Sequence, residues 1–314
     1  DSNTSEADNG KITGGKAEAE GDNNGGGIYV AAGADFDLFG GSITDNKAGN
    51  DGGGVYNAGL FNFYGGTITE NESTYGAGAY SSSAVDAAMN MYGGTISHNT
   101  AQLKGGGLFV QGNTVNIKGG TISNNEAINT DSGNGGGGVF IDNVGTVVNF
   151  AGGTISDNTA RRGGGVYANV GTINIDGSII TKNNAHWGGG VYNVHAKVTL
   201  SGDGTISHNQ TSAHGAGMYL NSSDGKYIIN GGYIKNNKAD NSGGAIYNNY
   251  TGEIVLNDGE ISGNSAKEGG AIYFRLGTLT MTGGEVRNNT SSNANGSGAG
   301  VSGTGTIELL GGVI

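Results

Sequence analysis

Carboxylates at equivalent positions of a recurring block are the first candidates for chemistry. The block reads Gly-Gly-Thr-Ile-Ser-x-Asn, and Asp45 and Glu70 each follow its isoleucine by two residues in successive copies, with His98 at that place in the next copy. If copies stack about 4.8 Å apart, two such carboxylates could divide acid and base roles or hold Ca²⁺, as polysaccharide cleavage requires. Later copies carry unrelated polar residues there: Asn124, Asp157 and Lys182. This variation is typical of a solvated turn, so we expect no catalytic residue.

A second column lies one residue before a run of small residues. It contains Arg162, Trp187 and His214, preceded in earlier copies by Tyr75 and Lys104. Trp187 is the only tryptophan, and stacked between a guanidinium and an imidazole it would form a cation–π ladder. An exposed indole could also stack on a sugar ring. We therefore predict a ligand-binding patch at Arg162, Trp187 and His214, with local stabilisation of a turn as the competing interpretation.

Other chemistry finds little support in the residues. The chain has no cysteine, and His208 and His214 are six residues apart, which is not a zinc-ligand spacing within one strand and turn. Nothing resembles a phosphate-binding loop or a dinucleotide fingerprint. We expect no metal and no cofactor.

Hydroxyl pairs flank the isoleucine of the block in five successive copies: Ser42/Thr44, Thr67/Thr69, Thr95/Ser97, Thr121/Ser123 and Thr154/Ser156. A flat hydroxyl array on a stacked fold is the geometry of an ice-binding face. The array decays toward the C-terminus, where Glu260 and Glu285 replace the first hydroxyl. Ordinary strand propensity at an exposed position is the simpler interpretation.

The composition excludes several classes of protein. Of 314 residues, 67 are glycine, none is proline and 13% are charged. Collagen needs a strict three-residue period with proline, and a flexible linker would not carry 34% apolar residues. The net charge of −12 disfavours nucleic acid as a partner. No apolar stretch approaches the roughly 18 residues of a membrane span, and no targeting segment opens the chain.

The positions above are placed by a repeat of about 27 residues. Its anchoring aliphatic residues are Ile12, Ile43, Ile68, Ile96, Ile122, Ile155, Ile180, Ile206, Ile234, Ile261, Val286 and Ile314. No segment has the period or length of a helix. Three short strands per unit cannot bury a face alone, but parallel stacking of units does. We predict an all-β fold, a single-stranded parallel β-helix of about 11 coils over residues 10–314, with residues 1–9 as a polar tail or cap. We also expect the chain to be a fragment of a longer solenoid.

Two further elements of each unit indicate which side chains point inward. Apolar pairs stand seven and five residues before most anchors: Phe36/Leu38, Phe61/Phe63, Met89/Met91, Val115/Ile117, Val148/Phe150, Ile173/Ile175, Tyr227/Ile229, Ile254/Leu256, Leu279/Met281 and Ile307/Leu309. Their period of two predicts an inward-facing pair on a strand. After each glycine run but the last, an aliphatic residue precedes an aromatic one, as in Val55 and Tyr56, whereas the last copy has Val301 and Ser302. We expect the aliphatic side chain inside and the aromatic one outside.

An asparagine follows ten of the twelve anchors by three residues, from Ile43 to Val286, and should form a structural ladder along the axis, because stacked amides satisfy one another and asparagine tolerates left-handed corners. The ladder residues are Asn46, Asn71, Asn99, Asn125, Asn158, Asn183, Asn209, Asn237, Asn264 and Asn289.

The blocks Gly243-Gly244-Ala245-Ile246 and Gly269-Gly270-Ala271-Ile272, with Ile-x-x-Asn after each Gly-Gly-Thr, resemble the short repeats of chlamydial-type polymorphic outer-membrane proteins. More broadly they resemble pectate-lyase-like β-helix adhesins of bacterial surfaces. The family's usual Phe-x-x-Asn is Ile-x-x-Asn here. The resemblance implies a right-handed helix, a bacterial extracellular setting attached to the cell surface, and an adhesive or stalk role.

From these observations we expect a secreted surface module rather than an enzyme, a rigid rod that attaches to a partner or spaces a tip domain from the cell. Its partners would be a host or neighbour-cell glycan or protein and further domains of a longer surface protein. The alternatives are a carbohydrate-active lyase or hydrolase built on the same fold and, as a minor one, an ice-binding protein.

Overall fold

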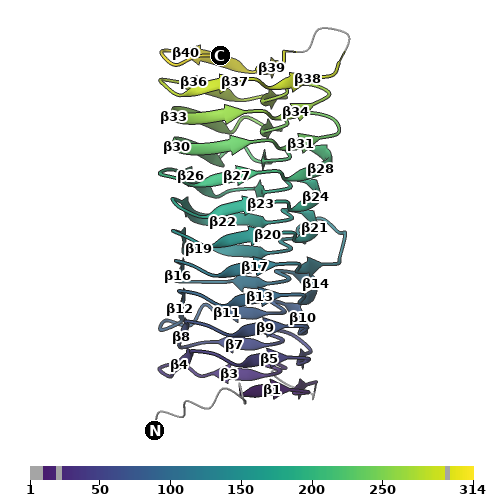
Figure 1. The fold of residues 1–314 in the computed structure, drawn as a ribbon, viewed down its shortest axis with the longest axis vertical. Helices are drawn as coiled ribbons and strands as arrows, with labels where there is room; N and C mark the ends of the chain where they lie inside the picture. The colour runs from purple at the N-terminus through teal and green to yellow at the C-terminus, as the bar shows by residue number, and fades with distance from the viewer. Residues whose placement is uncertain (1–9, 19–22, 294–297) are drawn as a thin grey trace.

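The computed structural model describes residues 10–18, 23–293 and 298–314. Within these ranges the chain is all-β, without a helix, and its parallel strands stack as a β-solenoid of about 11 turns spaced about 27 residues apart. The coils rise regularly from the N-terminal to the C-terminal end of an elongated rod (Figure 1). The predicted parallel β-helix is confirmed. Residues 1–9, the predicted tail or cap, lie outside the described residues.

Each coil contains four strand positions, as in β7 (Val55–Asn57), β8 (Leu60–Phe63), β9 (Thr67–Thr69) and β10 (Glu72–Tyr75). The first three positions belong to a 29-stranded sheet and the fourth to a separate 11-stranded sheet. We expected three strands. The fourth was missed because its residues are polar or small and carry no alternating apolar pattern.

The other strands follow the same order. At the first position lie β3 (Ile28–Val30), β11 (Ala79–Ser81), β15 (Leu108–Val110), β25 (Val191–Asn193), β29 (Met218–Leu220), β32 (Ile246–Asn248), β35 (Ile272–Phe274) and β39 (Val301–Gly303). At the second lie β4 (Asp35–Leu38), β12 (Ala88–Met91), β16 (Thr114–Ile117), β26 (Lys197–Leu200), β36 (Thr278–Met281) and β40 (Thr306–Leu309). Strands β19 (Val139–Phe150) and β22 (Val166–Ile175) run through both positions.

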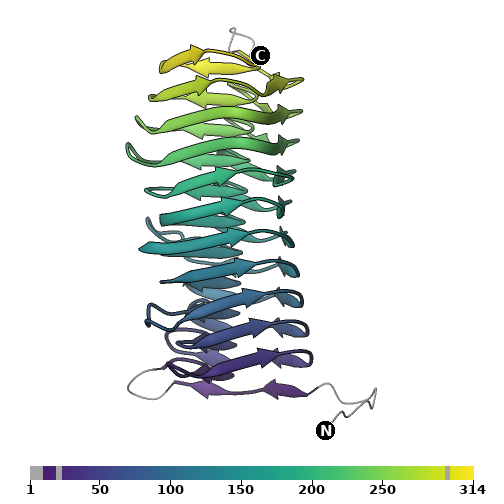
Figure 2. The same cartoon turned by 90° about the vertical axis from the view of Figure 1, so that its left-hand side faces the viewer.

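The third position holds β1 (Lys11–Thr13), β5 (Ser42–Thr44), β13 (Thr95–Ser97), β17 (Thr121–Ser123), β20 (Thr154–Ser156), β23 (Ile179–Thr181), β27 (Thr205–Ser207) and β37 (Glu285–Arg287). Strands β30 (Lys226–Lys235) and β33 (Glu253–Ser262) join the second and third positions. The fourth holds β2 (Lys16–Ala17), β6 (Lys47–Ala48), β14 (Thr100–Lys104), β18 (Glu126–Ala127), β21 (Thr159–Arg162), β24 (Asn184–Trp187), β28 (Gln210–His214), β31 (Lys238–Ala239), β34 (Ser265–Ala266) and β38 (Thr290–Ser291). Figure 2, turned by 90°, shows the strands of successive coils lying side by side along the rod.

The interior is a continuous apolar core along the axis. Nine of the ten predicted inward pairs fill it, and Phe61 and Phe63 are completely buried. The tenth pair, Ile307 and Leu309, is exposed, because it lies on the last coil that the structure describes, where no further coil covers it. The anchors, such as Ile68 and Ile96, pair with one another in register and are equally buried. Every coil presents apolar side chains at the same inward positions. The burial of these side chains against those of the neighbouring coils holds the stack together along the axis.

The asparagine ladder closes one corner of the core. Asn71 donates from its backbone N–H and from Nδ2 to Oδ1 of Asn99, at 3.0 and 2.9 Å, and its Nδ2 also donates to the carbonyl of Ile43. The same pattern recurs from Asn46 to Asn289. The left-handed residue is not the asparagine but the one before it, as at Glu70 with φ of 56°. The asparagine serves instead as a buried bridge between coils.

The aromatic residues form a second stack outside the main core. Ten rings lie 4.5 to 5.5 Å apart along the rod: Tyr29, Tyr56, Tyr80, Phe109, Phe140, Tyr167, Tyr192, Tyr219, Tyr247 and Tyr273. The aliphatic neighbour of each ring points into the main core, as expected. The aromatic side chains occupy the outer side of the strand but are mostly buried, because each ring covers its neighbours and residues from the fourth strand position close over them.

Candidate functional site

The predicted patch lies at the ends of three neighbouring strands. Arg162 ends β21 and pairs with Trp187 at the end of β24, and Trp187 pairs with His214 at the end of β28. A left-handed glycine then turns the chain toward the next strand, as Gly163 does with φ of 61°. A Cβ on the next residue, Gly164, would lie 2.5 Å from the carbonyl oxygen of Asn184. The glycine run therefore places the column at the same height on every coil.

The cation–π ladder forms only in part. The Arg162 guanidinium lies 4.9 Å from the centroid of the Trp187 ring, and that of Arg161 lies 5.2 Å from it. His186 meets the indole edge on at 4.2 Å. His214 instead lies 4.5 Å from the Tyr247 ring of the aromatic stack. The expected ladder therefore contains the Arg162 guanidinium and the Trp187 indole but not the His214 imidazole, because His214 packs on Tyr247 of the aromatic stack.

These three residues line one side of a small groove that runs along the rod above the aromatic stack, with a volume of about 320 Å³. Its size is at the lower end of small-molecule sites, which span about 300–1,000 Å³. We call it the aromatic groove. Its lining residues are Arg162, Trp187, Tyr192, His214, Tyr219, Asn221, Tyr247, Asn249 and Arg275.

The opposite rim of the aromatic groove was not predicted. Asn221, Asn249 and Arg275 each come directly after the first strand of their coil. Asn249 donates from Nδ2 to Oδ1 of Asn221 at 2.9 Å, and Arg275 is exposed. The repeat alone shows that these three residues occupy the same position after the first strand of their coils. Only the folded coil shows that this position lies across the groove from the column of Arg162, Trp187 and His214.

Burial sets the protonation of groups in and beside the groove. It lowers the pKa of His214, helped by nearby His186, and also the pKa of His186, helped by the two arginines. Both imidazoles are therefore neutral at pH 7. Burial raises the pKa of Tyr192 to about 12 and that of Tyr219 well above its usual value. Their hydroxyls stay protonated and remain hydrogen-bond donors.

The tips of the arginine pair are tied to a loop. Arg162 donates from Nη1 to the carbonyl of Asp131 at 2.8 Å, and Arg161 donates to the carbonyl of Thr130. This loop is an insertion relative to most other copies of the repeat, and it lies between β18 and β19. Another insertion, before Ala87, lies between β11 and β12, so these two leave the rod at different corners.

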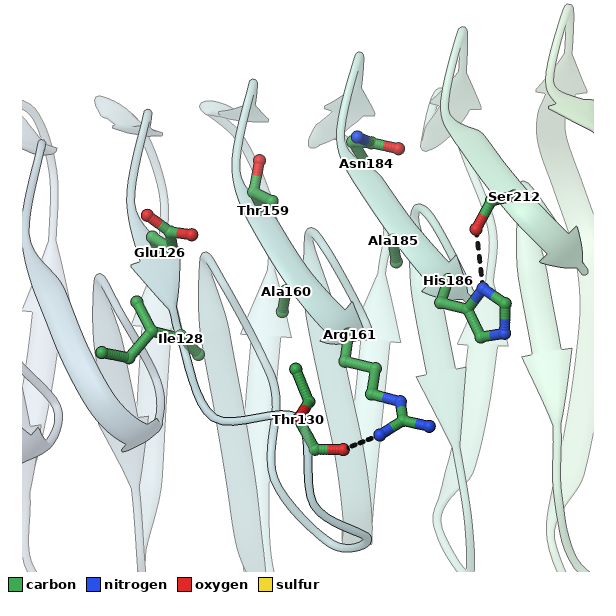
Figure 3. A pocket seen from close by; sticks show the side chains of 11 residues that line it. Glu126, Ile128, Thr130, Thr159, Ala160, Arg161, Asn184, Ala185, His186 and Ser212 are labelled. Carbon is green, nitrogen blue, oxygen red and sulfur yellow. Dashed lines mark hydrogen bonds between the residues drawn. The ribbon is translucent and has the colours of Figure 1, made fainter.

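A second hollow of about 600 Å³ lies on the outer face of the 11-stranded sheet, next to the groove. Figure 3 shows Glu126, Thr159 and Asn184 along one side of it and Ile128, Arg161 and His186 along the other, with alanines between the two rows. His186 Nδ1 lies 2.6 Å from Oγ of Ser212. Arg161 and His186 thus contact Trp187 and also border this hollow.

The carboxylate column lies on an exposed turn. Asp45 and Glu70 are left-handed residues with φ near 55°, as is His98. The Thr44 hydroxyl lies 3.3 Å from Oδ2 of Asp45 and 3.4 Å from Oε2 of Glu70. The two carboxylates do lie near one another, but both are exposed, and within the described ranges no group of three potential metal-ligating carboxylate, histidine or cysteine residues forms.

A serine, a histidine and an aspartate also meet, but not as a proton relay. Asp224 Oδ1 lies 2.6 Å from His195 Nδ1, and Ser222 Oγ lies 3.0 Å from the same nitrogen. In a nucleophilic triad the serine and the carboxylate contact opposite nitrogens of the imidazole. Here both contact Nδ1, so this geometry does not activate the serine.

The hydroxyl array is one column rather than a flat double array. The hydroxyls after the anchor are mostly buried, with Ser97 and Ser123 each 8% exposed. Those before it, such as Thr95 and Thr121, are half-buried.

A second, unpredicted aromatic surface is more exposed than the main aromatic stack. Phe39, 72% exposed, stacks on Tyr64, which stacks on Tyr92. Phe39 and Tyr92 cover the two faces of the Tyr64 ring, so only the edges of that ring reach the solvent.

Comparison with known proteins gives one match. Residues 231–249 and 258–275 match the family model of the Chlamydia polymorphic membrane protein repeat, which supports the resemblance drawn from the blocks at Gly243 and Gly269. No curated protein and no solved structure shows significant similarity to the chain. The described residues include no helix that is long and apolar enough to cross a membrane.

Proposed function

We propose that this chain is a rod-shaped module of a bacterial surface protein that binds a glycan or protein ligand in the aromatic groove. The observation that carries the proposal is the convergence of Arg162, Trp187 and His214 on one groove together with an opposite rim of polar side chains. A spacer has no need of such a rim. The polymorphic membrane protein repeat and the stacked parallel fold support the surface setting.

The direct test compares binding with stability. The 314-residue chain is applied to a glycan array and to epithelial cells, together with Trp187→Ala and with Tyr64→Ala as a matched aromatic control outside the groove. We expect Trp187→Ala to lose binding while its thermal transition shifts by only a few degrees, because the indole is half-buried. Tyr64→Ala should bind normally. If the unmutated rod binds nothing in either assay, it is a spacer.

We propose further that the chain has no enzymatic activity. The exposed position of Asp45 and Glu70 and the Nδ1-only contacts of His195 support this. Pectic, alginate and glycosaminoglycan polymers, incubated with the chain with and without Ca²⁺, should remain intact. Turnover that disappears in Asp45→Asn or Glu70→Gln would overturn the proposal and favour the lyase or hydrolase alternative.

A further inference from the structure

The arginines of this acidic chain are concentrated at one place. The sequence has four, Arg161, Arg162, Arg275 and Arg287, in a protein of net charge −12. Arg287 is neutralised by Glu260 and Glu285 at 3.0 and 3.1 Å. The other three lie at or beside the aromatic groove, and among the described residues none of them has a carboxylate within 4.0 Å.

Unpaired cations are not confined to the groove, since among the described residues only Lys47, Lys104 and Lys226 of the lysines have a carboxylate within 4.0 Å. Lys104 and Lys226, elsewhere on the rod, contact the carboxylates of Asp142 and Glu253 at 3.2 and 2.7 Å. What distinguishes the groove is that three of the four arginines lie at or beside it.

A carboxylate does approach one end of the aromatic groove at Glu268, but its Oε1 accepts a hydrogen bond from Asn293 at 3.1 Å and it is not part of the lining. Glu268 follows Ser242 in the column that contains His214, so it offsets the positive charge at the Arg275 end. The Arg162 end, by contrast, has no carboxylate within 4.0 Å of its guanidinium among the described residues.

The uncharged lining residues also favour an oxygen-rich ligand. The Nδ1 atom of His214 is buried and has no hydrogen-bond partner within the described parts of the chain. The rings of Tyr192, Tyr219 and Tyr247 stack on one another at 5.1 and 5.0 Å, so they offer edges and hydroxyls to the groove rather than faces. Since the Trp187 ring already carries two guanidinium groups, recognition would rest more on charge and hydrogen bonds than on stacking.

We infer that the aromatic groove binds a carboxylated glycan, with carboxylates held separately by Arg162 and by Arg275, which lie four coils apart along the groove, and with hydroxyls paired with the tyrosine hydroxyls, His214 and the Asn221–Asn249 amides. This inference rests on the proposed function and names the ligand class. A planar guanidinium fork matches a carboxylate through two parallel hydrogen bonds, which a lysine does not reproduce. Four coils at about 4.8 Å each span about 19 Å, which suits a short oligosaccharide with more than one charged unit.

The test measures binding of the full chain to four kinds of immobilised ligand: a uronate-containing glycan, a sialylated glycan, the carboxyl-reduced form of each, and polyglutamate. We expect the carboxylated glycans to bind roughly tenfold or more tightly than their reduced forms, because a charge-assisted fork is lost on reduction. The uronate and sialyl arms identify the source of the carboxylate. Affinity should fall as NaCl rises from about 0.05 to 0.5 M.

The variants separate the groove from the general charge of the rod. Arg275→Gln and Arg162→Gln should each lose roughly tenfold in affinity, and Arg162→Lys should recover only part of it. Arg287→Gln is the matched control and should bind normally, while Glu268→Gln should bind more tightly. Arg275→Gln is the cleaner variant, because Arg162 also holds the Asp131 carbonyl of the inserted loop.

The outcomes distinguish this inference from the proposed function. If reduced and carboxylated glycans bind equally, or if Arg275→Gln binds as well as the unmutated chain, the carboxylated sugar is wrong even where Trp187→Ala still abolishes binding. If polyglutamate binds as tightly as the glycans, the ligand is an acidic protein segment and the inference fails. If no glycan and no cell is bound, the proposed function itself fails.

Discussion

One aromatic stack runs from Tyr29 to Tyr273, and its rings are similarly buried in both halves between Phe109 and Tyr247, but the residues that lie over them differ. Over Phe109 and Phe140 it is covered: Tyr75 packs edge on against Phe109 at 5.7 Å, and Lys104 lies 4.7 Å from the Phe140 centroid while pairing with Asp142. Over Tyr192, Tyr219 and Tyr247 the corresponding positions form the open groove.

The comparison shows that rim residues, not the stack, decide where a groove opens. In the covered half, opposite charges on the two rims attract and bridge across the rings. In the open half, Arg162 and Arg275 stand on different rims four coils apart, and among the described residues neither has a carboxylate within 4.0 Å. Glu268, which continues the His214 column on the coil of Arg275, accepts a hydrogen bond from Asn293 instead. No ion pair bridges the rims in this half, so the groove stays open, and its unpaired guanidinium groups favour an anionic occupant.

The largest expected effects lie beneath both halves, in the asparagine ladder. Asn125→Ala, under the covered half, and Asn209→Ala, under the open half, each remove a buried amide that bridges three coils. We expect each to lower the free energy of unfolding by about 3 kcal/mol or more, because its buried partners lose hydrogen bonds. Urea denaturation measures this.

Equal losses at Asn125 and Asn209 would show that the two halves share one scaffold. Asn116→Ala provides the control, because Asn116 belongs to a half-exposed amide row on the outer face, where it donates to Asn90 at 2.9 Å. That substitution should cost less than about 1 kcal/mol. A markedly smaller loss at Asn209 than at Asn125 would contradict the shared scaffold.

Next in size is the loss of a ring from the covered half. Phe140 is fully buried, so Phe140→Ala should cost about 3 kcal/mol or more, as for other buried aromatics. Trp187→Ala, in the open half, should lower the free energy of unfolding by about 1 kcal/mol, because the indole is half-buried and makes cation–π contacts with Arg161 and Arg162. Thermal denaturation of the two variants side by side checks the difference, and equal losses would argue against an open groove.

A smaller effect is expected where the two rims are bridged. Lys104→Ala removes the ion pair with Asp142 and the contact with Phe140, and we expect a loss of about 1 kcal/mol because both partners are only part-buried. Asp142 keeps its hydrogen bond from Asn169 at 2.6 Å. Lys104→Met keeps the stem over the ring and should recover part of the loss. A loss that disappears in high salt would attribute the bridge to charge alone.

The smallest effect concerns Asp51, which pairs with Tyr75 in the covered half. Burial raises the pKa of Asp51 to about 6 from its usual 3.8. Between these two pH values the folded protein binds more protons than the unfolded chain, so this group makes stability fall as pH rises, and the penalty is complete above pH 6. Asp51→Asn should therefore stabilise the protein at pH 7 by about 1 kcal/mol or less, given the screening of a part-buried group.

The pH profile makes the Asp51 prediction specific. At about pH 3 and below, Asp51→Asn and the unmutated chain should have the same stability, because the carboxyl is then protonated in the folded state and largely in the unfolded state, whose pKa is 3.8. Melting temperatures measured between about pH 3 and 7.5 would show the gain appearing between about pH 4 and 6. A gain that is constant across this range would exclude a burial effect on the carboxyl.

The repeat by itself determined much of this protein. The period of about 27 residues and the inward pairs, such as Phe61 and Phe63, predict a parallel stack, because only stacking buries those positions. The buried pairs also fix the register between strands of successive coils. Arg162, Trp187 and His214, which occupy the same position in three successive repeats, must therefore lie in one column. The polar fourth strand escaped detection because it buries alanines, and alanine carries no strong strand signal.

Only the tertiary structure decided what lies across from that column. Sequence offsets give the height of a residue on the rod, but the distance between two offsets within a coil depends on how sharply each corner turns. The closed coil brings Asn221 and Arg275 to the far side of the same groove, turns His214 onto Tyr247, and covers the aromatic rings that the alternating pattern placed outside. Packing at the corners, rather than the repeat, therefore formed the site.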